Sequence, residues 1–349
     1  MRCFFLKKVI SILLVTVILL AGCTAKTDNE QQIGENGFKA CKITDSLGRT
    51  VEITSEPQRI VSGYYISTSI LIALGQKDKI VGIEDKAESR PIYTLVDPKL
   101  IELPGVGTAK QFDLEGTAAL KPDLVILPKK LKDVAGALDE LGIRTIFVNP
   151  EGMPGLIDSI NMIARACGAD ERGADLVDTI NTIKNTKLQD LLKEQPKTRV
   201  YLAGNSSYLK TAGSKMYQNS MITIAGGENV AADITDDYWA EISYEQLLAY
   251  NPEVIIIASD AQYSVEDVMK DENLQQIDAV KNGKVYAMPS VAEAWDSPVP
   301  ATVFGSWWTA LRLHGDVLDE NEYYSGVADF YAWFYGFDVN RAGIAEALK

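Results

Sequence analysis

The chain contains 349 residues, of which 46% are hydrophobic and 23% charged, so it is long enough for one large or two medium globular domains. Its formal net charge is −14, and loss of residues 1–22, which carry three cations and no acid, would lower it to −14 − 3 = −17. A negative excess of this size disfavours nucleic acid as a partner and gives no help in binding anionic lipid.

The N-terminus predicts an export signal with a lipid attachment site. A basic head at residues 2–8 precedes an apolar stretch at 9–20, and small residues stand directly before Cys23. The sequence Leu-Ala-Gly-Cys resembles the bacterial lipobox, in which the cysteine sulfur is acylated and becomes part of the first mature residue. The alternative is a transmembrane anchor, but the stretch is short for a span, which needs about 20 residues. We therefore expect residues 1–22 to be a lipoprotein signal peptide and the mature chain to be lipid-anchored on the extracytoplasmic face of the cell membrane.

Residues 23–42 are polar and lack periodicity, which predicts a flexible tether. A chain of some 19 residues of this composition has a mean reach on the order of 25 Å. Two further cysteines are Cys41 and Cys167. The sequence leaves open whether they pair, and their spacing indicates no disulfide framework.

Short apolar runs without alternation recur along the chain and are interleaved with helical patterns. The runs lie at residues 59–63, 79–83, 123–127, 145–148, 199–204, 254–259 and 284–289. Such runs are typical of parallel strands that helices bury on both faces. We therefore predict an α/β fold with two doubly wound, Rossmann-like lobes, an N-terminal lobe at 43–169 and a C-terminal lobe at 196–349.

The segment between the two sets of strands predicts one long helix. Residues 170–195 keep a helical apolar period and are ended by Pro196. At 1.5 Å per residue, roughly 25 residues span about 37 Å, which is enough to bridge two lobes. We expect a ligand cleft between lobes that are joined by this single α-helix, and only modest closure because such a hinge is stiff.

Residues 114–127 and 244–257 are two versions of one pattern. Aligned without a gap, they share a glutamate, an alanine, a proline and an isoleucine. The pairs are Glu115/Glu245, Ala119/Ala249, Pro122/Pro252 and Ile126/Ile256. Each copy predicts a short helix that carries a glutamate, a helix stop marked by proline, and an apolar strand. The chain is therefore expected to build one α/β unit twice.

The lipobox, the paired pattern and the connecting helix together resemble the class III substrate-binding proteins of ABC importers, which carry iron-siderophore, haem or cobalamin. The resemblance covers about residues 43–335. It implies that Glu115 and Glu245 engage arginines of a membrane permease. The alternative is that both are ordinary solvated helix glutamates. However, like charges on separate lobes do nothing for folding, whereas two separated acids can fix the position of a basic partner at two points. The resemblance also implies a monomer that binds a small molecule.

The ligand is expected between the lobes, at the carboxyl ends of the strands. The candidate binding residues are Tyr64, Tyr65, Arg90, Lys110, Lys130, Asn205, Tyr217, Trp239, Trp295 and Asp296. In cobalamin-binding members, an aromatic residue lies six positions before each docking glutamate. Trp239 holds that place here in the second copy and Ala109 in the first, so a two-aromatic clamp lacks its first half unless Tyr64 or Tyr65 replaces it.

Two stretches, 211–234 and 284–316, resemble a narrower branch that includes molybdate- and tungstate-binding members. Arg90, Lys110 and Lys130 suit an oxyanion or the acidic groups of a siderophore, and free backbone N–H groups after Tyr65 favour an anion. The plain alternatives are that these cations are solvated loop charges and that Tyr217 only packs its own lobe. We expect an iron complex of the siderophore type, with an oxyanion, a corrinoid or haem as alternatives.

The sequence carries no enzyme signature. Its single histidine, His314, follows a helix, so a bare zinc or manganese site is not expected, and no cofactor is expected either. There is no G-x-G-x-x-G that follows a strand and no H-E-x-x-H, G-x-S-x-G or phosphate loop. A secreted enzyme or an adhesin on an α/β scaffold stays a remote alternative.

Overall fold

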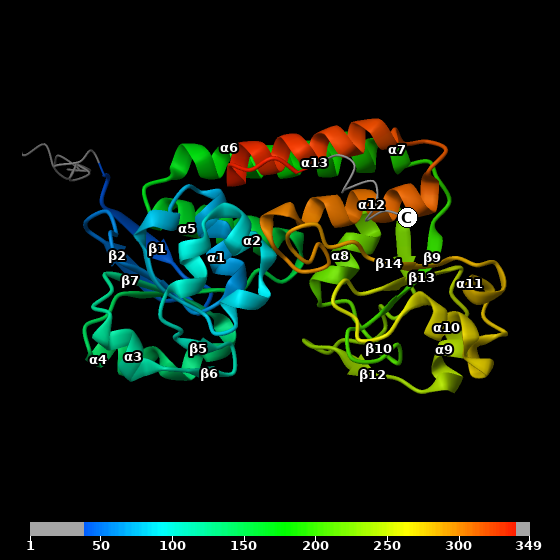
Figure 1. Ribbon diagram of the computed structural model, residues 1–349, viewed down its shortest axis with the longest axis horizontal. Helices are drawn as coiled ribbons and strands as arrows, with labels where there is room; N and C mark the ends of the chain where they lie inside the picture. The colour runs from blue at the N-terminus through cyan, green and yellow to red at the C-terminus, as the bar shows by residue number, and fades with distance from the viewer. Residues whose placement is uncertain (1–37, 340–349) are drawn as a thin grey trace, which may run out of the picture.

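The computed structural model describes residues 38–339. The predicted signal peptide, Cys23 and most of the predicted tether lie outside this range. Within it, the chain forms two sheets that are flanked by helices (Figure 1). No helix in the described part of the chain is both long and apolar enough to span a bilayer.

The first sheet contains four parallel strands in the order β4-β3-β7-β8. These strands are β3 (Ile60–Ser62), β4 (Ile80–Ile83), β7 (Leu124–Pro128) and β8 (Thr145–Val148). Its helices are α1 (Tyr65–Ala73), α2 (Pro91–Val96), α3 (Leu114–Ala119), α4 (Ala135–Glu140) and α5 (Gly152–Ala166). Two hairpins, β1 (Cys41–Thr44) with β2 (Thr50–Ile53) and β5 (Gly107–Thr108) with β6 (Gln111–Phe112), complete this half. Nearly every residue of the four strands is buried, as expected for a sheet covered on both faces.

The second sheet has six strands, and its parallel centre again carries an apolar core. Its strands are β9 (Thr198–Ala203), β10 (Lys210–Thr211), β11 (Gly227–Asn229), β12 (Ala240–Glu241), β13 (Val254–Ile257) and β14 (Val285–Ala287). Its helices are α8 (Tyr217–Ile224), α9 (Tyr244–Tyr250), α10 (Val265–Lys270), α11 (Asp278–Lys281), α12 (Val303–His314) and α13 (Glu320–Tyr335). The β10 and β12 edge is antiparallel, whereas β9, β11, β13 and β14 run parallel.

The predicted connecting helix is helical over most of its length but is not one uniform α-helix. It comprises α6 (Asp170–Thr182), a π-helical segment (Ile183–Gln189) and α7 (Asp190–Leu192). α6 packs against α5, and the π-helical segment packs against α12. The chain therefore crosses from one sheet to the other along this helical run.

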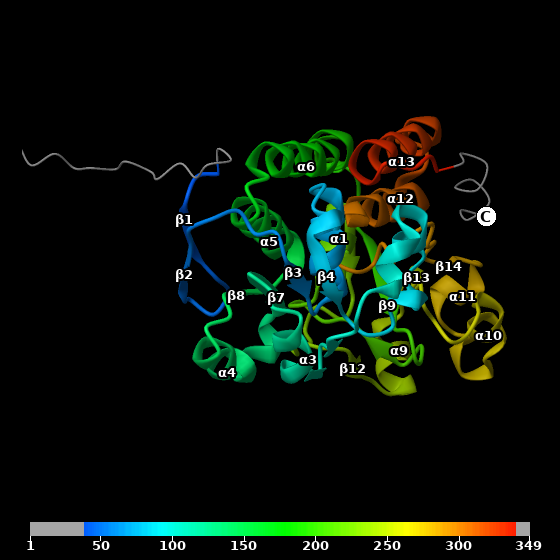
Figure 2. The ribbon, with the colours of Figure 1, turned by 60° about the vertical axis from the view of Figure 1, so that its left-hand side comes forward.

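Helix α13 reinforces the crossing. It lies beside α6 in both views (Figures 1 and 2) and packs against α1 of the first half. Arg172 of α6 donates hydrogen bonds to the carbonyls of Ala73 at the end of α1 (2.8 Å) and Trp333 near the end of α13 (2.7 Å). A cation is favoured at helix C-termini, where carbonyls have no helical partner. The largest apolar cluster runs without a break from the first half through α6 into the second half, so the hinge region is packed rather than loose.

The two copies of the sequence pattern fold alike, as predicted. Helix α3 is capped by Asp113 and α9 by Ser243, each accepting a backbone N–H in the first turn. Both helices are followed by a residue in the left-handed region, Lys121 (φ 49°) and Asn251 (φ 36°). The equivalence extends to the start of each following strand. There the side chains of Asp123 and Glu253 accept the backbone N–H groups of Arg59 and Arg199 at 2.9 Å.

Candidate binding cleft

A cleft of about 600 Å³ opens at the carboxyl ends of the first sheet and faces residues of the second half. Its walls combine the ends of β3, β7 and β8 with a loop before β12. The lining residues are Tyr64, Ala109, Pro128, Lys129, Lys130, Lys132, Val148, Asn149, Pro150, Glu151, Lys215, Asp237 and Tyr238. The carboxyl ends of parallel strands are where α/β proteins place their ligands, so this cleft is the first candidate site.

Two contacts cross the cleft. Lys130 Nζ lies 4.3 Å from the ring centroid of Tyr238, a side chain that is 57% exposed. Glu151, an exposed residue directly before α5, accepts the backbone N–H of Tyr217 at 3.2 Å, and partial desolvation of its carboxyl raises the pKa. Lys215 at the rim pairs with Asp237 at 3.3 Å. The two halves are thus already in contact across the cleft at these two points.

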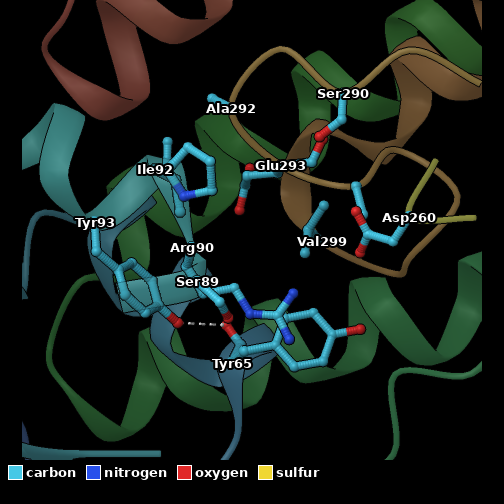
Figure 3. A pocket seen from close by; sticks show the side chains of 12 residues that line it. Tyr65, Ser89, Arg90, Ile92, Tyr93, Asp260, Ser290, Ala292, Glu293 and Val299 are labelled. Carbon is cyan, nitrogen blue, oxygen red and sulfur yellow. Dashed lines mark hydrogen bonds between the residues drawn. The ribbon is translucent and has the colours of Figure 1, made fainter. Parts of the chain in front are cut away.

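A second, smaller chamber of about 40 Å³ lies between α2 and the loop after β14 (Figure 3). The guanidinium of Arg90 lies over the ring of Tyr65, with its Cζ 4.1 Å from the centroid, and Asp260 and Glu293 stand across the open space. The chamber belongs to both halves, because the backbone N–H of Ile92 donates to the Ala292 carbonyl at 3.1 Å.

Three cations at the two cavities have no ion-pair partner within the described residues, whereas Lys215 pairs with Asp237. Within residues 38–339, no carboxylate lies within ion-pair distance of Arg90, Lys129 or Lys130. An arrangement of this kind favours a ligand that brings negative charge.

Two buried carboxyls lie behind Arg90. Glu84 accepts hydrogen bonds from the Tyr93 hydroxyl (2.5 Å) and the Thr68 hydroxyl (2.8 Å), yet burial raises its pKa to about 7. Glu293 accepts from the hydroxyl of Ser69, and burial raises its pKa to about 7 as well. Burial disfavours the charged form of an acid, and these bonds only partly offset it. Neither glutamate is among the predicted binding residues, because a lone acid in a loop carries no sequence pattern.

Three of the predicted binding residues are placed inside the protein. Trp295 is 0% exposed, and its indole N–H donates to the Tyr331 hydroxyl at 2.9 Å. Tyr217 is equally buried and packs within α8 and its neighbours. The Asp296 carboxylate accepts the Ser259 hydroxyl at 2.5 Å, and burial raises the pKa of this carboxyl. Trp295 and Asp296 fix the loop after β14 against α13 and the end of β13, and none of the three side chains lines either cavity. Their partners, such as Tyr331 for Trp295 and Ser259 for Asp296, come from elements distant in sequence, so local sequence patterns do not reveal this burial.

The other candidates are distributed as follows. Tyr64 lines the cleft with Lys130, and Tyr65 lines the chamber with Arg90. Lys110 is exposed on the β5–β6 turn. Trp239 is half-buried against Gly204, where an added Cβ would lie 2.9 Å from its ring.

Asn205 is half-buried at the end of β9, and its carbonyl accepts the Gln262 N–H at 2.8 Å. The structure therefore gathers Tyr64, Tyr65, Arg90 and Lys130 at the junction of the halves. In the described part of the chain, no cluster of three or more His, Cys, Asp or Glu is placed to hold a metal ion. Cys41 and Cys167 are both free, buried thiols.

Glu115 and Glu245 occupy equivalent exposed positions in the first turns of α3 and α9. A hydrogen bond from its own backbone N–H, with one from Ser243, holds the pKa of the Glu245 carboxyl below its ordinary value. Both helices lie along the side of the molecule opposite α6 and α13 (Figures 1 and 2). The two helices that carry these glutamates thus lie on one side of the molecule, each in a different half.

Comparison with known proteins agrees with this architecture. The profile of the periplasmic binding protein family matches residues 60–292, more than half of the chain, and the chain belongs to that family. Molybdate-binding protein MolA of Haemophilus influenzae is 28% identical over 320 residues, covering 84% of this chain and 90% of that protein. Fe(3+)-citrate-binding protein YfmC of Bacillus subtilis is 26% identical over 288 residues, covering 80% and 87%.

A solved structure of MolA bound to molybdate has a TM-score of 0.76 with this one at 26% identity, and covers 86% of this chain and 99% of its own. That MolA is described as the cognate periplasmic binding protein of an ABC transporter. The expected class, a substrate-binding protein with a two-lobe α/β fold, is therefore confirmed.

Proposed function

We propose that this substrate-binding protein of an ABC importer captures a small anionic metal species in the cleft between its two halves. The observation that carries the proposal is the set of unneutralised cations at the junction, Arg90, Lys129 and Lys130. Charge-assisted hydrogen bonds from such groups to carboxylate or oxyanion oxygens are about twice as strong as neutral ones. The local positive charge stands out in a chain whose formal net charge is −14.

Two kinds of ligand match this chemistry. A ferric chelate with carboxylate groups suits the larger cleft of about 600 Å³, and the similarity to the Fe(3+)-citrate-binding protein supports it. A compact oxyanion such as molybdate suits the chamber of about 40 Å³ beside Arg90, and the similarity to MolA supports that choice. A flat corrinoid is disfavoured, because Ala109 lines the cleft where the first aromatic of a clamp would stand.

A thermal-shift screen tests the proposed ligand class. The purified mature protein is scanned with molybdate, tungstate, ferric citrate, a ferric siderophore, cobalamin and haemin. A ligand that binds only the folded state at about a hundred times its Kd adds about 2.7 kcal/mol of stability. We expect a clear rise in Tm with an anionic metal species and none with cobalamin. A rise with cobalamin alone would exclude the anionic class.

Docking to the permease is proposed to use Glu115 and Glu245. The two glutamates are exposed, and the helices that carry them lie on one side of the molecule in different halves, so both can meet arginines of a permease at once. Such charge pairing fixes the register of two partners more than it adds affinity. Because each glutamate moves with its own half, the spacing of the pair reports whether the cleft is open or closed.

A lipid anchor at Cys23 is proposed from the sequence alone, since this residue lies outside the described range. We expect wild-type protein in the membrane fraction of the producing cells and Cys23→Ser protein released in soluble form. Two acyl signals are needed for stable anchoring, and one thiol substitution removes their attachment point. Fractionation followed by immunoblotting measures the difference. Equal membrane retention of both proteins would show that another segment holds the chain.

A further inference from the structure

The chamber of Figure 3 is a composite of groups from both halves of the molecule. Arg90 and Tyr65 come from the first half, whereas Asp260 and Glu293 come from the second. Its volume is about 40 Å³, and a single water needs at least about 10–15 Å³ of such space. The chamber is therefore large enough for a compact oxyanion or for one carboxylate group of a larger chelate, but not for a whole chelate.

Glu293 is bound asymmetrically at the edge of this chamber. Its Oε1 accepts from the Ser69 hydroxyl, which is also paired with the Tyr335 hydroxyl at 2.9 Å. Its Oε2 is buried and has no hydrogen-bond partner within the described residues. A buried acceptor without a partner costs about 1–3 kcal/mol, and more if it is charged. A proton on Oε2 removes that cost and converts the atom into a donor.

We propose that Glu293 is a specificity-determining residue that recognises the anionic ligand in its protonated form. Arg90 supplies positive charge from one wall, and the Oε2 hydrogen of Glu293 is donated from the other. The proton comes from solvent and stays on Oε2, so each bound anion is accompanied by the uptake of one proton. This inference rests on the proposed function, because it assigns a recognition mode to the same site.

The surroundings of Glu293 are consistent with this role. The charged and titratable groups around it are Arg90, Tyr65, Tyr93 and Asp260 of the chamber wall, and Tyr331 and Tyr335 of α13. Burial raises the Glu293 pKa to about 7, and hydrogen bonds with Ser69 and Tyr335, followed by the charge of Arg90, oppose this rise. An anion that neutralises Arg90 removes its part of the opposition, so ligand and proton favour each other's binding.

The recognition mode restricts the ligand class. The chamber requires an oxygen that accepts a hydrogen bond next to an anionic oxygen that pairs with Arg90. Molybdate and the carboxylate edge of a ferric chelate both present this chemistry. Arg90 and the protonated carboxyl are both hydrogen-bond donors. A cation, or a ligand whose surface offers only donors, has no acceptor for them and is therefore rejected.

A definite pH dependence follows. Protonated Glu293 is present below about pH 7 and is lost as the pH rises through this value. Affinity for the anion is therefore expected to be nearly constant below this range and to fall above it, by about tenfold per pH unit when one proton must be taken up. Molybdate stays a dianion throughout, so any proton taken up with it belongs to the protein.

Isothermal titration calorimetry of the full mature protein with molybdate, and separately with ferric citrate, tests the proposal. Each titration is run at about pH 6, 7 and 8 in two buffers of different ionisation enthalpy, which yields the number of protons taken up. The test variant is Glu293→Gln, which keeps a neutral donor. The matched control is Glu140→Gln, an exposed residue of α4 outside both cavities.

We expect wild type and Glu140→Gln to take up about one proton per anion near pH 8, where Glu293 is ionised before binding. We expect Glu293→Gln to take up none and to bind with pH-independent affinity. Unchanged proton uptake in a folded Glu293→Gln variant would overturn the inference and leave the proposed ligand class intact. Failure of wild type to bind either anion would overturn both.

A second measurement covers the case in which Glu293→Gln does not fold. Difference infrared spectroscopy of wild type at about pH 8 follows the C=O band of protonated carboxyls when molybdate is added. A gain in this band upon binding supports proton uptake by a carboxyl. Molybdate binding without any gain in this band contradicts the proposal, and this test needs no substituted protein.

Discussion

Replacing Glu115 and Glu245 together by lysine is expected to abolish uptake while leaving the affinity for ligand unchanged. Each substitution turns an attraction toward a basic permease surface into a repulsion. Removing one partner of a close charge pair at an interface costs about 2–5 kcal/mol, so loss of both pairs lowers transport by well over about a hundredfold. Ligand affinity is retained because neither residue lines the cleft or the chamber.

The comparison requires a control with the same change of net charge. Glu171→Lys with Glu320→Lys reverses two exposed carboxylates on α6 and α13, on the side of the molecule opposite α3 and α9. Uptake of radiolabelled ligand in cells and ligand affinity in solution are measured for both double variants. Normal uptake by the Glu115/Glu245 variant would refute the docking proposal. Equal loss in the control variant would show that bulk charge, rather than position, matters.

Arg90→Gln is expected to weaken binding of the anionic ligand by about 10- to 150-fold. A hydrogen bond to a charged group is worth about 1.5–3 kcal/mol, and no carboxylate of the described chain lies within ion-pair distance of this guanidinium. The side chain also packs over Tyr65, so its loss opens the wall of the chamber that faces Glu293. Both effects act against the ligand.

Arg144→Gln is the matched control for this prediction, because Arg144 lies at the amino end of β8, away from both cavities, and donates to the Asp123 carbonyl at 3.4 Å. Affinities of the two variants are measured by calorimetry with molybdate and with ferric citrate, and Tm values verify folding. Unchanged affinity in folded Arg90→Gln protein would remove Arg90 from the site. An equal loss in both variants would assign the effect to general electrostatics.

Local patterns in the sequence predicted much of the fold. Uninterrupted apolar runs correspond to the buried parallel strands, and the repeated pattern corresponds to α3–β7 and α9–β13. The repeat was visible because capping, helix termination and strand burial each leave a mark within a few residues. The connecting helix was also predicted, but not its π-helical segment at Ile183–Gln189, since no local pattern distinguishes π from α geometry there.

The candidate site was only partly predictable. Position at a strand end indicated Tyr64, Tyr65, Arg90 and Lys130 and brought them to the junction of the halves. The same criterion also selected Trp295, which the packing of α13 takes into the core. Whether a loop side chain turns inward depends on partners such as Tyr331, which lie far away in sequence.

Glu293 illustrates the opposite failure. A single acid between two alanines carries no sequence signal, and its importance arises only when Ser69 of α1 and the chamber beside Arg90 are seen next to it.

The packing of α13 also limits how far the cleft can open. Because α13 runs beside the connecting helix and contacts α1, we expect opening of the cleft to be small and to proceed by sliding of packed helices.

The location of a bound metal anion tests the account most directly. Crystals of the mature protein grown with molybdate, or with ferric citrate, are measured at the absorption edge of the metal, and the anomalous signal locates it. We predict one strong peak between the two halves, with ligand oxygens in contact with the Arg90 guanidinium. A fully occupied metal anion elsewhere on the molecule, with the Arg90 chamber holding only water, would contradict the account.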